Sequence, residues 1–68
     1  MKVNLTICET KEIEIDDKFL SLGEEHRKGL SQKDIQNLQD EMYKYLRNNF
    51  GIVPKNILSI YHSHEEIF

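Results

Sequence analysis

Apolar and polar residues alternate in two short runs near the start of the chain. Val3 and Leu5 are each followed by a polar residue, and Ile13 and Ile15 are flanked by acidic residues. A period of two residues is typical of a β-strand that packs one face on a core. The pattern predicts strands over residues 2–8 and 11–16. Phe19, Leu20 and Leu22 either extend the second strand to residue 22 or form a short piece of their own.

A helical period begins in the middle of the chain. Ser31 is a favourable N-cap, and Asp34 lies three residues later, where a carboxylate stabilises the positive end of a helix. Gly51 suits the left-handed position that ends a helix, and Pro54 prevents its continuation. We predict a loop over residues 23–30 and a helix over 31–49, with an apolar stripe of Ile35, Leu38, Met42, Tyr45 and Leu46.

The last apolar run predicts a third strand over residues 56–62, with Leu58 and Ile60 facing the core. Residues 63–68 are polar for most of their length, and we expect them to form a frayed tail. The order of these elements predicts an α+β fold, a small ββαβ domain. Its three-stranded antiparallel sheet has the strand order 2-1-3, and the amphipathic helix covers one face.

Size and composition restrict what this fold can be. The 68 residues, of which 38% are hydrophobic and 31% charged, suffice for one small domain. Because Cys8 is the only cysteine, no disulfide can form within the chain, and we expect a homodimer to supply extra stability. The sequence has no apolar run of roughly 18 residues and no pattern of a signal peptide, which predicts a cytoplasmic location away from membranes.

One face of the predicted sheet is left uncovered by the helix. Its residues are partly apolar and partly polar, so it is either a dimer or partner surface or an ordinary solvated face. The sequence leaves both interpretations open. The candidate dimer face consists of Asn4, Thr6, Cys8, Ile57, Ser59 and Tyr61.

Charge is distributed unevenly along the chain. Residues 1–25 contain seven acidic and three basic side chains, whereas residues 26–61 contain six basic and three acidic ones. Carboxylates at strand spacing can occupy a basic groove on another protein, and cations on an outer helix face can contact phosphate. Asp40 interrupts the basic stripe, and the overall charge is −3, so we do not expect nucleic acid as the main partner. The candidate partner-binding carboxylates are Glu9, Glu12, Glu14, Asp16 and Asp17, and the candidate phosphate contacts are Lys33, Lys44 and Arg47.

The residue types that could perform catalysis or bind metal are few. His62 and His64 lie on one side of an extended segment and are weak candidates for a zinc site, because a lasting site needs three or four ligands. Cys8 has no base that the sequence places beside it, and a structural thiol is the simpler interpretation. We expect neither enzyme activity nor a cofactor.

A stretch around the predicted helix start is similar to a known family. The residues Lys28-Gly29-Leu30-Ser31, followed by Asp34, Ile35 and Leu38 and preceded by His26, resemble the short phage-encoded inhibitors of uracil-DNA glycosylase. That resemblance implies a strand-strand-helix-strand protein that acts as a dimer and binds another protein.

Three hypotheses about function follow. The first is a non-enzymatic protein-binding module, a homodimeric inhibitor or regulator of a phage or mobile element, which occludes a surface of a larger partner such as a nucleic-acid enzyme. The second is a small regulatory protein that contacts nucleic acid through the basic outer helix face. The third is a metal-binding protein that uses His62 and His64.

Overall fold

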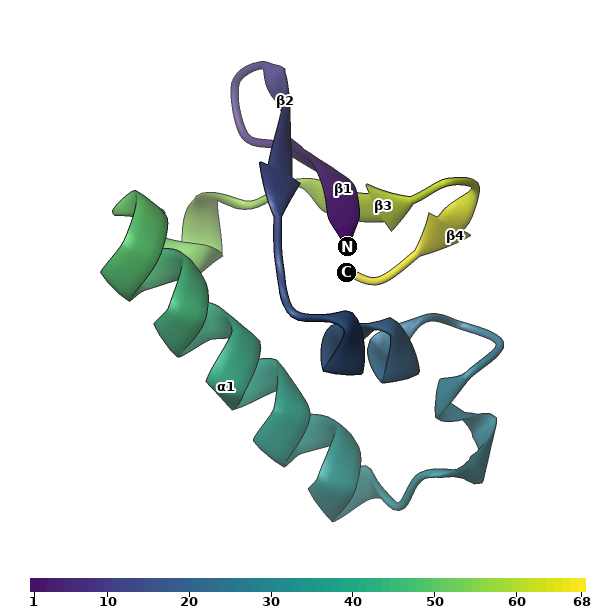
Figure 1. The fold of residues 1–68 in the computed structure, drawn as a ribbon. Coiled ribbons are helices and arrows are strands. Elements are labelled where there is room, and N and C mark those ends of the chain that lie inside the picture. The colour runs from purple at the N-terminus through teal and green to yellow at the C-terminus, as the bar shows by residue number, and fades with distance from the viewer.

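An antiparallel sheet and one long helix make up the computed structural model, which describes residues 1–68 (Figure 1). The strands are β1 (Lys2–Thr6), β2 (Thr10–Glu14), β3 (Ser59–His62) and β4 (Glu65–Glu66), and the helix is α1 (Gln32–Phe50). Three short 3₁₀ helices complete the chain: η1 (Asp17–Leu22), η2 (Arg27–Gly29) and η3 (Pro54–Asn56). The predicted α+β class is confirmed. No helix has the length and apolarity that crossing a membrane requires.

The sheet has four strands in the order β2-β1-β3-β4, and every neighbouring pair is antiparallel. The predicted order of the first three strands is correct, but the prediction of only three strands is wrong. β4 pairs with β3 through the residues expected to fray, and the Ile67 amide donates to the Ile60 carbonyl at 2.8 Å. The Ile67 side chain is only 2% exposed. Burial of this apolar residue is one of the contacts that hold the tail on the sheet.

Alternating residues of the strands fill the core, as the sequence pattern predicts. Val3 lies opposite Ile13, and Leu5 lies opposite Ile60, all four with their side chains buried. The strands themselves are shorter than predicted, since β1 ends at Thr6 and β2 at Glu14.

The segment after β2 turns into the 3₁₀ helix η1 instead of continuing as a strand. The Asp16 carboxylate accepts a hydrogen bond from the Lys18 amide at 3.0 Å and so caps this helix. Phe19 and Leu22 are three residues apart, which puts them on the same side of a helix with three residues per turn, and both are buried. The extension of the second strand to residue 22 is therefore wrong, and these residues form the alternative, a short element of their own. Likewise, the predicted loop over 23–30 contains a second 3₁₀ turn, η2.

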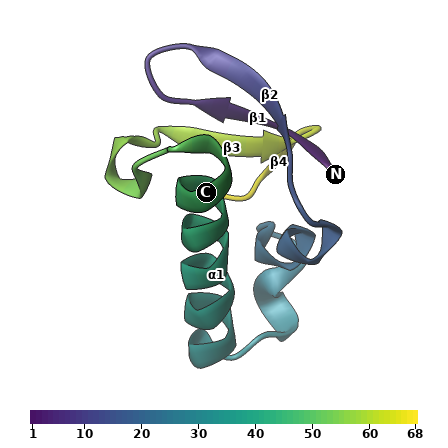
Figure 2. The same ribbon diagram turned by 60° about the vertical axis from the view of Figure 1, so that its left-hand side comes forward.

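The helix α1 begins and ends where the capping residues predict. The Ser31 hydroxyl accepts from the Asp34 amide at 3.1 Å, and Gly51 takes a left-handed φ of 67° after the last turn. Met42 and Leu46 are fully buried. Figure 2 shows the helix running steeply away from the strands: its C-terminal turns approach the sheet, and its N-terminal turns lie beside η1 and η2.

The run before β3 differs from the prediction in its phase. Pro54 starts the η3 turn, in which the Ile57 amide donates to the Pro54 carbonyl at 3.0 Å, and β3 begins only at Ser59. Ile57 consequently lies in the core, 6% exposed, whereas Leu58 is 70% exposed. The strand pattern predicts the reverse, with Leu58 facing the core and Ile57 on the open face, and is wrong for both. A turn shifts the alternation because its residues do not follow the strand period of two.

Candidate functional site

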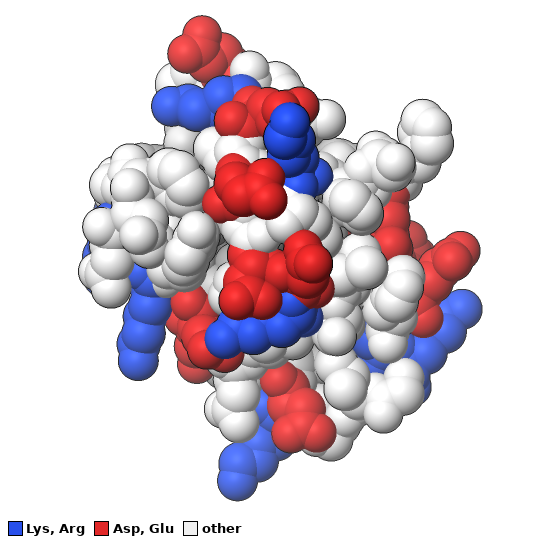
Figure 3. All heavy atoms as spheres, in the orientation of Figure 1, with Lys and Arg blue, Asp and Glu red and all other residues white.

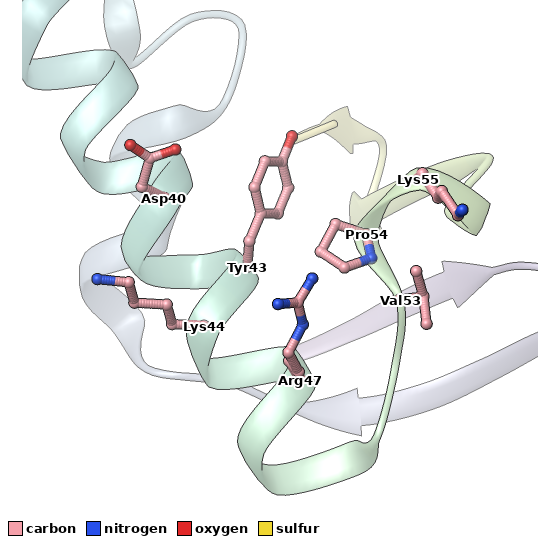
Figure 4. A pocket seen from close by; sticks show the side chains of 7 residues that line it. All are labelled: Asp40, Tyr43, Lys44, Arg47, Val53, Pro54 and Lys55. Atoms are coloured by element: carbon pink, nitrogen blue, oxygen red, sulfur yellow. The ribbon is translucent and has the colours of Figure 1, made fainter.

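The largest hollow of the molecule is an open groove of about 600 Å³ between α1 and η3. Its lining combines three cations and one carboxylate with a phenol ring and two apolar side chains (Figure 4). The lining residues are Asp40, Tyr43, Lys44 and Arg47 of α1, and Val53, Pro54 and Lys55 of the segment that follows it.

Local structure explains why these side chains meet. The four helical residues are spaced by three, one and three positions, so they lie on one side of α1. The left-handed turn at Gly51 reverses the chain, and the buried side chain of Ile52 anchors the returning segment. The η3 turn then lies beside the last turns of the helix, and the groove is the space between them.

The cations of the groove have no acidic partner. None of Lys44, Arg47 and Lys55 takes part in an ion pair, although other cations of the chain do. In Figure 4 the Arg47 side chain points across the groove toward Pro54, whereas the end of the Lys44 side chain points away from the groove. The guanidinium therefore offers unused donors that match a carboxylate or phosphate.

Tyr43 contributes a ring and a donor to the groove. Its ring packs edge-on against Phe68, with 5.7 Å between the ring centroids. Burial raises the pKa of the Tyr43 phenol above its usual value, and the nearby Asp40 carboxylate acts in the same direction. The hydroxyl therefore keeps its proton and can donate a hydrogen bond at neutral pH.

The predicted basic stripe is only partly assembled. Lys44 and Arg47 both line the groove, but Lys33 does not, because it lies about three helical turns before Lys44. The sequence did not single out Tyr43 and Val53 as site residues. Their inclusion depends on the path of the chain after α1, and the only hint of it was the Gly51 and Pro54 pair.

Most carboxylates of the acidic hairpin are engaged within the molecule. The N-terminal amine lies 3.2 Å from Glu14 Oε1 and 2.7 Å from Asp17 Oδ1, and its hydrogen bond holds the pKa of Asp17 below the usual range. Glu12 is 3.9 Å from the Lys2 ammonium, whereas Glu9 has no ion pair. Figure 3 shows acidic side chains following one another down the middle of the view, with basic ones between them. Asp16, the fifth candidate, is the cap of η1.

The open face of the sheet is more polar than the sequence suggested. Asn4 lies between Glu12 and Tyr61, and the hydroxyls of Thr6 and Thr10 are 2.8 Å apart. Tyr61, at 37% exposed, is the one large apolar side chain on this face. Among the other candidates for a dimer face, Ser59 pairs with Thr6, Cys8 is exposed in the bend after β1, and Ile57 is in the core.

His26 and His62 bind to different parts of the molecule. His26 Nδ1 lies 2.7 Å from Glu65 Oε1, and His62 Nδ1 lies 3.1 Å from the Lys2 carbonyl oxygen. Nowhere in residues 1–68 do three side chains gather that could hold a metal ion. A second, smaller hollow of about 330 Å³ is lined by Glu24, Glu25, His62, Ser63, His64 and Glu65.

Comparisons with family models, curated proteins and solved structures found no match to this chain. Residues 28–38, for which the sequence leads us to expect a likeness to the glycosylase inhibitors, include part of η2 and the first two turns of α1. This segment lies outside the groove.

Proposed function

We propose that this protein is a small, non-enzymatic binding module that holds an acidic segment of a partner protein in the groove between α1 and η3. The supporting observation is that Lys44, Arg47 and Lys55, all without acidic partners, line one open groove. A carboxylate entering this groove gains charge-assisted hydrogen bonds and separates no existing ion pair.

A protein segment suits the groove better than nucleic acid does. Asp40 lies in the lining, and its charge would repel a continuous phosphate backbone that passed along the helix. The chain as a whole carries a charge of −3, which disfavours non-specific attachment to a polyanion. Contact with nucleic acid through Lys44 and Arg47 is the second candidate, since the same two cations would then bind phosphates.

In its sharpest form the proposal is an inhibitor or regulator that covers a surface of a larger partner. Its support is the resemblance of residues 28–38 to the phage-encoded inhibitors. A homodimer remains part of the proposal. Sedimentation velocity over a range of protein concentrations tests it, and a monomer at every concentration would remove it.

Peptide binding tests the groove directly. The probe is a fluorescein-labelled nonapeptide with four glutamates, and fluorescence anisotropy measures its affinity at low salt. The double variant Lys44→Glu with Arg47→Glu should bind the peptide at least about tenfold more weakly, because the attractive contact at Arg47 becomes repulsive and a second cation of the lining is reversed. Lys33→Glu is the control, because it reverses one charge on the same helix outside the groove.

The outcomes distinguish the candidate functions. Loss of peptide binding in the double variant, with Lys33→Glu unchanged, supports the proposal. A labelled 20-base-pair DNA duplex that binds more tightly than the peptide, and is released by the same double variant, would favour the nucleic-acid alternative. Equal binding of the peptide by all three proteins would eliminate the groove as the site.

A further inference from the structure

The groove has an apolar part as well as a charged one. Val53 is 40% exposed and Pro54 is half-buried, and the two follow each other along the wall opposite α1. Solvent-facing apolar residues are ordinary when single, but here two of them lie inside a concave site. A partner made only of carboxylates would leave this apolar surface without a counterpart.

The cations are placed on both sides of the apolar wall. Arg47 reaches toward Pro54 from the helix, and Lys55 lies on the far side of Val53 and Pro54 (Figure 4). An extended peptide lying across the groove would therefore meet a cation, an apolar surface and a second cation in turn. Successive residues of such a peptide advance by about 3.3 Å, so a few residues suffice to reach all three.

The helix also sets a limit on where acidic residues fit. Asp40 lies seven residues before Arg47, which is about 10 Å along the helix axis. A carboxylate near Asp40 would be repelled, while one near Arg47 would be attracted. Arg47 and Lys55 thus make the end of the groove next to η3 the most favourable position for acid.

From this arrangement we infer that the partner segment has an apolar side chain with a carboxylate on each side of it. The apolar side chain covers Val53 and Pro54, one carboxylate binds Arg47, and the other binds Lys55. This inference rests on the proposed function and adds the sequence pattern of the partner. Burial of the apolar side chain supplies selectivity among acidic segments, because charge alone would accept any of them.

Two peptides of equal length and charge test the pattern. The first nonapeptide has a central leucine between two glutamates on each side, with glycine and serine at its ends, and the second has serine in place of leucine. The wild-type protein should bind the leucine peptide about five- to tenfold more tightly by fluorescence anisotropy. Val53→Ser should remove most of this difference, because it replaces the exposed apolar side chain of the wall.

Leu58→Ser is the matched control for Val53→Ser. Leu58 is a more exposed apolar residue that does not line the groove, so its replacement should leave both affinities unchanged. Thermal melting by circular dichroism checks that both variants are folded. In a second pair of variants, Arg47→Glu and Lys55→Glu, each change should weaken the binding of both peptides.

The failure of this inference differs from the failure of the proposed function. If wild type bound the two peptides with equal affinity, and Arg47→Glu weakened the binding of both, the apolar contact would be overturned. The proposal that the groove binds acidic segments would be unaffected. No binding of either peptide would overturn both. A preference for leucine that survives Val53→Ser and disappears in Leu58→Ser would overturn the inference by moving the apolar contact out of the groove.

Discussion

His26 Nδ1 lies 2.7 Å from Glu65 Oε1, and this pair joins the segment between η1 and η2 to the last strand of the sheet, 39 residues along the chain. The Glu24 amide adds a longer hydrogen bond of 3.3 Å to the Glu66 carbonyl. Together with the burial of Ile67, these contacts hold β4 against the rest of the domain.

The His26 pair predicts a pH dependence of stability. Its hydrogen bond is the main reason that the pKa of Glu65 is lowered in the folded protein, with the charge of His26, the Glu25 amide and His62 acting in the same direction. A carboxylate with a lowered folded-state pKa stabilises the fold above its unfolded pKa of about 4.5, and this stabilisation is lost as the pH falls through the folded value. Glu65→Gln should therefore lower the melting temperature at pH 6 and have much less effect at pH 3.

Calorimetry or circular dichroism melting of wild type and variant between pH 3 and pH 6 measures this difference. Glu66→Gln is the matched control, because Glu66 is the exposed neighbour that has no ion pair. If the two variants lost the same stability at every pH, the His26 contact would have no special role.

Gly23 gives an independent way to disturb the same pair. A Cβ atom on residue 23 would overlap the Glu65 carboxylate, and it would lie 3.0 Å from the Leu20 carbonyl oxygen. Gly23→Ala should push Glu65 away from His26 and lower stability at pH 6. Combining Gly23→Ala with Glu65→Gln should lower the free energy of unfolding by less than the sum of the two single changes, because both changes remove the same contact between His26 and Glu65. Additive losses in a double-mutant cycle would contradict this coupling.

Ile67 should be a core residue despite its place next to the end of the chain. Its side chain is as buried as those of the central strands, so Ile67→Ala should lower the free energy of unfolding by about 2–5 kcal/mol. Urea denaturation monitored by circular dichroism gives the value. His64→Ala, an exposed change in the turn between β3 and β4, should stay within about 0.5 kcal/mol of wild type. A similarly small effect at Ile67 would mean that the tail frays after all.

Gly51 should be the glycine at which an alanine is most costly for the backbone. Its φ of 67° is left-handed, so Gly51→Ala should destabilise the protein by about 1–2 kcal/mol although the space around it is open. Gly29→Ala is the matched control, because it also meets open space and its φ is not left-handed. Equal stability of the two variants in urea denaturation would show that the turn relaxes to accept a side chain.

The sequence by itself determined the elements that have a regular spacing of apolar residues or a capping residue at their ends. Alternation in β1 and β2 and the Ser31 and Gly51 caps of α1 are local signals, since strand and helix periods and capping hydrogen bonds involve neighbouring residues. These signals were enough for the α+β class and for the order of the first three strands. They were also enough to mark Lys44 and Arg47 as cations on one outer helix face.

Only the tertiary structure decided the elements that are stabilised by distant contacts. β4 has two residues, and no local pattern distinguishes Glu65 and Glu66 from a solvated tail. The strand is stabilised by burial of the Ile67 side chain and by the hydrogen bond between Glu65 and His26. The groove arises in the same way. Val53 and Lys55 line one groove with Arg47 because the chain reverses at Gly51 and turns at Pro54. The buried side chains of Ile52 and Ile57 anchor the returning segment, and no period in the sequence specifies its path.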